Sequence, residues 1–100
     1  TVSDSFQMAP VVDNFGPAEA AWRGIDAGQD LVLMPTDPTA AVSGIADAAA
    51  NGSLPASRLQ DAATRVYALR LALARAPRPG LDVVGSAANA QVAAQARAQG

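Results

Sequence analysis

Residues 30–34, Asp30-Leu31-Val32-Leu33-Met34, decide the fold class of this chain. The apolar run after the first residue shows no polar alternation, which predicts a strand covered on both faces, as in a parallel sheet flanked by helices. Gly28 before the run is typical of a helix stop. The turn cluster of residues 35–38 follows it, and there Asp37 is expected to cap a helix whose first residue is Pro38.

Three helices are predicted around this strand, at about residues 17–27, 38–50 and from 54–55 onward. Each has apolar residues at helical spacing, which indicates one buried face. The expected buried positions are Ala21, Trp22 and Ile25 in the first helix, Val42, Ile45 and Ala49 in the second, and Leu59, Ala62, Val66, Leu69 and Leu73 in the third.

A second β-favouring run begins at Val2 and ends in Ser3-Asp4, before a loop that is expected to reach about Gly16. In parallel α/β folds, the residues just past the carboxyl ends of strands form the site. Asp4 is therefore the best candidate for chemistry, with Ser3 as a polar neighbour that helps to keep it ionised. Met8 is interpreted as core or as the wall of a pocket. From position alone, the more common case for such an Asp is a loop residue that caps a turn.

Composition removes most other kinds of site. The chain has no Cys and no His, which excludes disulfides, thiolate or His-ligated metals and a self-contained Ser-His-Asp triad. The net charge is −2 and no basic run exists, which argues against nucleic-acid binding. No apolar stretch reaches the roughly 18 residues of a membrane span. No signal peptide is visible, and the compartment stays open between the cytoplasm and bacterial export.

The remaining charged and aromatic residues are interpreted as structural. Asp13 and Asn14 are expected to form a turn, Glu19 to favour the start of a helix, and Tyr67 to lie near a buried stripe. The residues interpreted as solvated or capping are Asp26, Asp30, Asp47, Asp61, Arg58, Arg65 and Arg75.

The order of elements predicts a piece of a larger domain. One strand and the end of another do not make a stable sheet, so further strands are expected from elsewhere. Pro77-Arg78-Pro79-Gly80 breaks the long helix, and Ser86 is a candidate cap for a last one. We expect residues 1–76 to form one unit, 77–85 a linker and 86–100 a C-terminal helix.

Six segments in this order resemble the end of the catalytic barrel of glycoside hydrolase family 3, and in particular the bacterial β-N-acetylhexosaminidases. That branch has Ser-Asp, two or three variable residues and then Met. The resemblance covers about residues 1–75, and residues 82–97 are similar to the segment that leads into the second domain of longer members. The matching segments are Ser3–Met8, Phe15–Ala21, Ala27–Pro35, Asn51–Leu54, Arg58-Leu59 and Arg65–Leu69.

The resemblance implies an α/β fold, the C-terminal fragment of a (β/α)8 barrel, mostly helical as it stands and with a trailing helix. It implies a retaining glycosidase for terminal β-linked N-acetylglucosamine or related β-glycosides, with Asp4 as nucleophile and Met8 beside the sugar. No metal or organic cofactor is implied. The branch takes its general acid/base from a His on an earlier loop, so this piece alone is expected to be inactive and to require the remainder of the barrel. Ser5 and Phe6 depart from the commoner residues at their positions.

Two other interpretations stay open. Because most of the chain is Ala-rich helix, it is also compatible with a non-catalytic helical interaction module. A second alternative is a barrel segment of another enzyme family, in which Asp4 binds substrate through hydrogen bonds.

Overall fold

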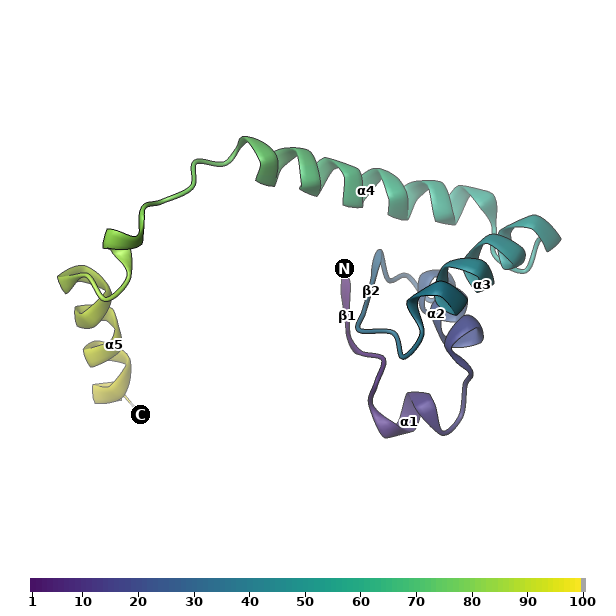
Figure 1. The fold of residues 1–100 in the computed structure, drawn as a ribbon, viewed down its shortest axis with the longest axis horizontal. Coiled ribbons are helices and arrows are strands. Elements are labelled where there is room, and N and C mark those ends of the chain that lie inside the picture. Colours follow the sequence, from purple (N-terminus) through teal and green to yellow (C-terminus); the bar gives the residue numbers. More distant parts are fainter. Residues whose placement is uncertain (100) are drawn as a thin grey trace.

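The computed structural model describes residues 1–99, which are mostly helical with one small sheet (Figure 1). Gly100, the last residue of the expected C-terminal helix, lies outside the described residues. The elements in chain order are β1 (Val2–Ser5), α1 (Ala9–Val12), α2 (Pro17–Asp26), β2 (Leu31–Leu33), α3 (Pro38–Asn51), α4 (Ala56–Arg75), the 3-10 turn η1 (Leu81–Val83) and α5 (Ala87–Gln99).

The sheet consists of β1 and β2, which pair in parallel, and α2 lies in the long crossover connection that a parallel pair needs. The register joins Val2 to Leu31 and Ser5 to Leu33, so three steps along β1 face only two along β2. The extra residue in β1 is a bulge. Both strands lie where they were predicted, although β1 extends one residue further, to Ser5.

The predicted helix ends are confirmed by their caps. Pro17 occupies the first turn of α2, and Gly28 follows that helix with a φ of +108°. The Asp37 carboxylate accepts a hydrogen bond from the Ala40 amide at 3.0 Å and begins α3. Gly52 ends α3 in the left-handed conformation, with a φ of +82°. These short-range signals are sufficient to place α2 and α3 along the chain.

Helices α2 and α3 lie side by side and contact each other through small residues (Figure 1). Gly44 of α3 faces the backbone of Ala18, so closely that an added Cβ would come within 2.6 Å of the Ala18 carbonyl oxygen. The close contact turns Ala41 and Ala48 inward with Gly44 and leaves Val42 69% exposed. The prediction that Val42 lies on the buried stripe was therefore wrong.

The core is a small cluster between the sheet, α2, α3 and α4. Its buried members are Ile25, Ala48, Leu54 and Ala62, and the half-buried side chains packed against them are Trp22, Val32, Ile45 and Leu59. Most of these positions had been predicted from helical spacing. Alanines supply two of the four buried residues, so the core buries little area per residue.

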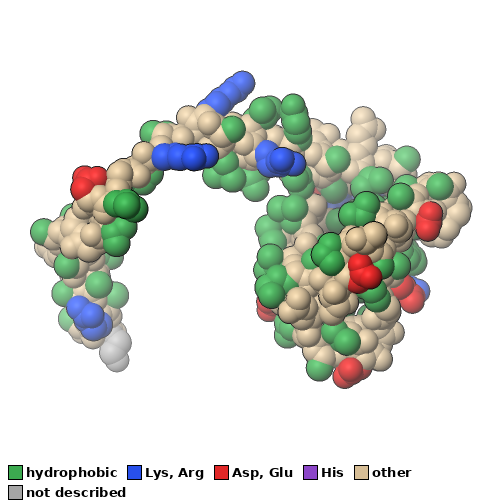
Figure 2. Space-filling view, in the orientation of Figure 1, with side chains coloured by type: hydrophobic (Ala, Val, Ile, Leu, Met, Phe, Trp, Pro, Cys, Tyr) green, Lys and Arg blue, Asp and Glu red, His purple; other side chains and the backbone are tan. Residues whose placement is uncertain are grey.

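Two predictions of burial fail at the margins of this core. β2 is not covered on both faces, because Leu33 is 44% exposed. Leu69 and Leu73 of α4 are 47% and 64% exposed, because the second half of this helix extends beyond the sheet (Figure 1). Figure 2 shows hydrophobic side chains remaining on the surface of both the body and α4.

The segment before Gly16 is also not the plain loop that was expected. It contains α1, which has Met8 as its N-cap and Pro10 in its first turn. The Met8 carbonyl accepts hydrogen bonds from the amides of Val11 and Val12, at 2.9 and 3.1 Å. A four-residue helix has no periodic apolar face that a sequence pattern can reveal.

Beyond α4 the chain runs through η1 into α5, which lies apart from the sheet (Figure 1). The Ser86 hydroxyl accepts a hydrogen bond from the Asn89 amide at 3.4 Å, near the start of α5. Among the described residues, no helix is long and apolar enough to cross a membrane.

Candidate active site

The carboxyl ends of β1 and β2 meet at one edge of the sheet because the strands are parallel. The Phe6 amide donates to the Leu33 carbonyl at 2.9 Å, which holds the strands together at this edge. From here the chain leaves β1 toward Met8 and leaves β2 through Met34. In parallel α/β folds this is the edge at which ligands bind.

The bulge in β1 lies at Ser3 and Asp4, next to this edge. Ser3 is buried, and its hydroxyl oxygen accepts a hydrogen bond from the Leu33 amide at 2.8 Å. The Ser3 hydroxyl thus accepts the hydrogen bond of a β2 amide that, in a regular parallel pair of strands, would donate to a backbone carbonyl of β1. Bulges are common beside active sites because they re-aim a side chain. Here the residue that follows Ser3 in the irregular part of β1 is Asp4.

Asp4 is exposed at this edge. Its Oδ1 accepts a hydrogen bond from the Ser5 amide at 2.7 Å, which fixes the carboxylate against its own strand. The ion pairs within residues 1–99 do not include Asp4. Its carboxylate therefore keeps lone pairs for a ligand, whether it acts as a nucleophile or only as a hydrogen-bond acceptor.

Met8 lies on the turn that follows β1. The Gln7 amide donates to the Ser5 hydroxyl at 3.2 Å, and the Met8 amide donates to the Ser5 carbonyl at 3.3 Å. Met8 then caps α1 with its own carbonyl, while its side chain is 47% exposed. The fold thus places Asp4 and Met8 at the same edge of the sheet, four residues apart and on opposite sides of a hydrogen-bonded turn.

An apolar cavity of about 220 Å³ lies between α1 and α2. Phe6 reaches over Gly24 here, where an added Cβ would come within 2.9 Å of its ring. Arg23 also lines the cavity; it pairs with Glu19 at 2.8 Å, and its guanidinium carbon lies 5.8 Å from the centroid of the Phe15 ring. Neither Asp4 nor Met8 lines this cavity. It therefore belongs to the packing of α1 on α2, and Glu19 is engaged by a neighbour on its own helix.

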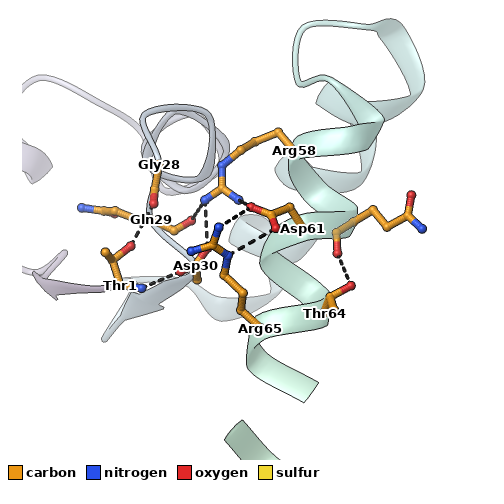
Figure 3. Close-up of polar contacts among 9 residues, drawn as sticks. Thr1, Gly28, Gln29, Asp30, Arg58, Asp61, Thr64 and Arg65 are labelled. Atoms are coloured by element: carbon orange, nitrogen blue, oxygen red, sulfur yellow. Dashed lines mark hydrogen bonds and ion pairs between the residues drawn. The ribbon is translucent and has the colours of Figure 1, made fainter. Parts of the chain in front are cut away.

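A polar cluster lies at the opposite, amino-terminal end of β2 (Figure 3). Asp30 is 9% exposed, and its carboxylate receives hydrogen bonds from the Thr1 ammonium and from Nη2 of Arg58, the latter at 3.1 Å. Arg58 also donates to the Gln29 carbonyl at 2.7 Å. The hydrogen bond from the Thr1 ammonium, and then the one from Arg58, hold the pKa of Asp30 below its ordinary value although burial raises it.

The predictions that Asp30 is a solvated or capping residue and that Arg58 is a solvated charge were therefore wrong. α4 begins beside the start of β2, so Asp30 and Arg58 lie in contact although 28 residues separate them in the sequence, and both side chains are largely shielded from water. A signal existed in the sequence, because Asp30 directly precedes an apolar strand and a carboxylate there needs a partner when it is covered. The cluster lies at the amino end of β2, away from Asp4, and we interpret it as structural.

The other residues interpreted as structural follow their expected positions with one exception. Asn14 donates to the Pro10 carbonyl at 2.8 Å and closes a turn, and Arg65 pairs with Asp61 at 3.1 Å on the surface. Tyr67 is 65% exposed and does not lie near a buried stripe. No three potential metal ligands lie together within the described residues.

Comparison with protein families connects this geometry to a class of enzymes. Residues 1–69 match the model of the glycosyl hydrolase family 3 N-terminal domain. No match was found among curated proteins or among solved structures. The matched region contains both strands, α1 to α3 and most of α4, and so includes the whole edge at which Asp4 lies. The chain therefore belongs to glycosyl hydrolase family 3, a family of glycosidases whose substrates are carbohydrates.

Proposed function

We propose that this chain is the last part of the catalytic barrel of a retaining glycosidase in which Asp4 is the nucleophile. The observation that carries the proposal is the bulged carboxyl end of β1, which presents an exposed carboxylate at the edge shared with β2. In a (β/α)8 barrel, residues at this end of the strands form the site. The family match supports a glycosidase, and the strand geometry supports Asp4 as its attacking group.

The chemistry requires two groups. An ionised carboxylate attacks the anomeric carbon as the glycosidic bond breaks, and an acid protonates the departing oxygen. Water then attacks the glycosyl ester, restoring the carboxylate and releasing the sugar with its configuration retained. Asp4 supplies the first group, and the acid comes from another loop of the barrel.

The substrate we propose is a terminal β-linked N-acetylglucosamine or a related β-glycoside. The support is the spacing of Ser3-Asp4 and Met8, which is similar to that of the bacterial β-N-acetylhexosaminidase branch. Met8 is half exposed at the same edge, where its thioether forms an apolar wall for the sugar.

The remaining strands of the barrel come from outside residues 1–99 in this proposal. A two-stranded parallel sheet with exposed apolar residues has too little core to close a barrel by itself. We further propose that residues 1–76 complete the barrel, with 77–85 as a linker to the helical segment 86–100.

The experiment replaces Asp4 with alanine in the intact enzyme and measures hydrolysis of an aryl β-N-acetylglucosaminide. We expect turnover to fall at least about 1000-fold, because the covalent step loses its nucleophile. Asp13→Asn is the matched control, since Asp13 also lies between β1 and α2 and is the C-cap residue of α1. Full activity of the Asp4→Ala variant would exclude Asp4 as the nucleophile.

A further inference from the structure

Met34, the first residue after β2, has a backbone conformation that methionine rarely adopts. Its φ is +49°, and within residues 1–99 it is the one residue other than glycine with a positive φ. The left-handed region brings Cβ close to the following carbonyl and is normally left to glycine or asparagine. Pro35 follows, and a residue before proline is normally held in the extended region, near a φ of −120°. Met34 therefore has a backbone conformation that is disfavoured both by its own Cβ and by the proline that follows it.

The position of Met34 is at the edge that carries Asp4. The preceding residue, Leu33, pairs with Ser5 in the register and accepts the hydrogen bond of the Phe6 amide. Met34 thus leaves β2 at the point where the chain leaves β1 for Met8. Two methionines, the only two in the sequence, follow the carboxyl ends of the two paired strands.

Packing within the described chain does not account for the Met34 side chain. It is 51% exposed, it is absent from the core cluster, and it lines neither the cavity at Phe6 nor the groove between β2 and α4. Non-glycine residues held in sparsely populated backbone conformations cluster at active sites and ligand clamps, where the strained geometry is part of the mechanism.

We propose that Met34 contacts the substrate and helps to determine its specificity, as an apolar wall for the glycosyl unit bound at Asp4. The inference rests on the proposed function of this edge. A thioether is polarizable and adaptable, and it suits the C–H face of a sugar ring. With Met8 following β1 and Met34 following β2, the sugar is held between two apolar side chains.

The test separates the side chain from the backbone. In the intact enzyme, Met34→Gly removes the thioether and at the same time relieves the left-handed backbone. We expect its Tm to be unchanged or higher, its KM for the aryl β-N-acetylglucosaminide to rise about tenfold, and its kcat to change less than about twofold. Met34→Leu keeps the apolar bulk and is expected to restore KM to within about threefold of the wild type. Val92→Ala, at an exposed site on α5, is the control and should leave both constants unchanged.

An unchanged KM in Met34→Gly would overturn the inference. So would a fall in Tm with a parallel loss of kcat, because that result identifies a packing residue. Calorimetry measures the affinity of the Asp4→Ala variant for N-acetylglucosamine, with and without Met34→Gly. This affinity reports on the contact with Met34 in the absence of turnover. Weaker binding in the double variant supports Met34 even if Asp4→Ala is fully active and the nucleophile assignment fails. Equal binding, or no binding by either variant, contradicts the role of Met34.

Discussion

Arg58 of α4 and Asp30, the residue before β2, form an ion pair that attaches the long helix to the sheet (Figure 3). Nη2 and Oδ1 are 3.1 Å apart, and the two side chains are only 18% and 6% exposed. Pairs shielded in this way differ from surface pairs in one respect. Removing one partner leaves the other charge in a poorly solvated position.

We expect Arg58→Ala to destabilise the protein by on the order of 2–3 kcal/mol, somewhat less than the loss of a fully buried pair because the Arg58 side chain keeps 18% of its surface exposed. Arg65→Ala is the matched control on the same helix. Arg65 pairs with Asp61, but the side chains are 63% and 51% exposed, so its loss should cost no more than about 1 kcal/mol. Urea denaturation of the two variants measures the difference, and equal midpoints would show that burial of the Asp30 pair is unimportant.

The same carboxylate predicts how the stability of the 100-residue chain, with its free ammonium at Thr1, depends on pH. The pKa of Asp30 in the folded protein is lowered by the hydrogen bonds from the Thr1 ammonium and Arg58, so the unfolded chain takes up a proton at a higher pH than the folded one. The stabilisation is therefore present above the ordinary Asp value of about 3.9 and is lost as the pH falls through the folded pKa.

Thermal unfolding of the wild type and of Asp30→Asn between about pH 7 and pH 3 tests this dependence. The wild type should be more stable at neutral pH, and its advantage should shrink in acid as Asp30 becomes protonated. Asp47→Asn, at an exposed position of α3, is the control for replacing a carboxylate with an amide. A gap between wild type and Asp30→Asn that is the same at both ends of the range would contradict the lowered pKa.

The bulge gives a prediction about activity. Ser3→Ala removes the acceptor of the Leu33 amide, so a half-buried N–H loses its partner and the bulge next to Asp4 loses its anchor. Because misplacement by about 1 Å can cost about 100-fold in rate, we expect kcat to fall on the order of tenfold or more, with a modest loss of Tm. Ser43→Ala, at an exposed position of α3, is the control for hydroxyl loss. An unchanged kcat in Ser3→Ala would mean that the bulge does not position Asp4.

The contact between α2 and α3 gives a prediction about packing. A Cβ at Gly44 would lie 2.6 and 2.7 Å from the carbonyl oxygen and Cα of Ala18, which are backbone atoms that cannot rotate away. Gly44→Ala should therefore push the helices apart and cost about 1–3 kcal/mol. Nothing lies within 4 Å of the corresponding position at Gly16, and Gly16→Ala is expected to cost less than about 1 kcal/mol in urea denaturation.

Features that depend on residues close together in the sequence, such as helix ends, could be predicted. Features that depend on contacts between distant parts of the chain were missed. Pro17 and Asp37 begin helices through short-range effects, and the strand-end rule was sufficient to select Asp4 as a candidate. The bulge at Ser3 depends on the register between two strands, and the pairing of Arg58 with Asp30 depends on where α4 crosses the sheet. Periodicity contains no information about either contact.

The isolated chain of residues 1–100 should not hydrolyse an aryl β-N-acetylglucosaminide above the rate of the buffer. It has no His, and its one Glu, Glu19, is paired with Arg23 on α2, so it lacks the acid that the proposed mechanism takes from another loop of the barrel. Its exposed apolar side chains and open sheet should also make it associate, so that it elutes in gel filtration above its mass of 10.0 kDa. Hydrolysis by this piece that disappears with Asp4→Ala would show that the second catalytic group lies within these residues.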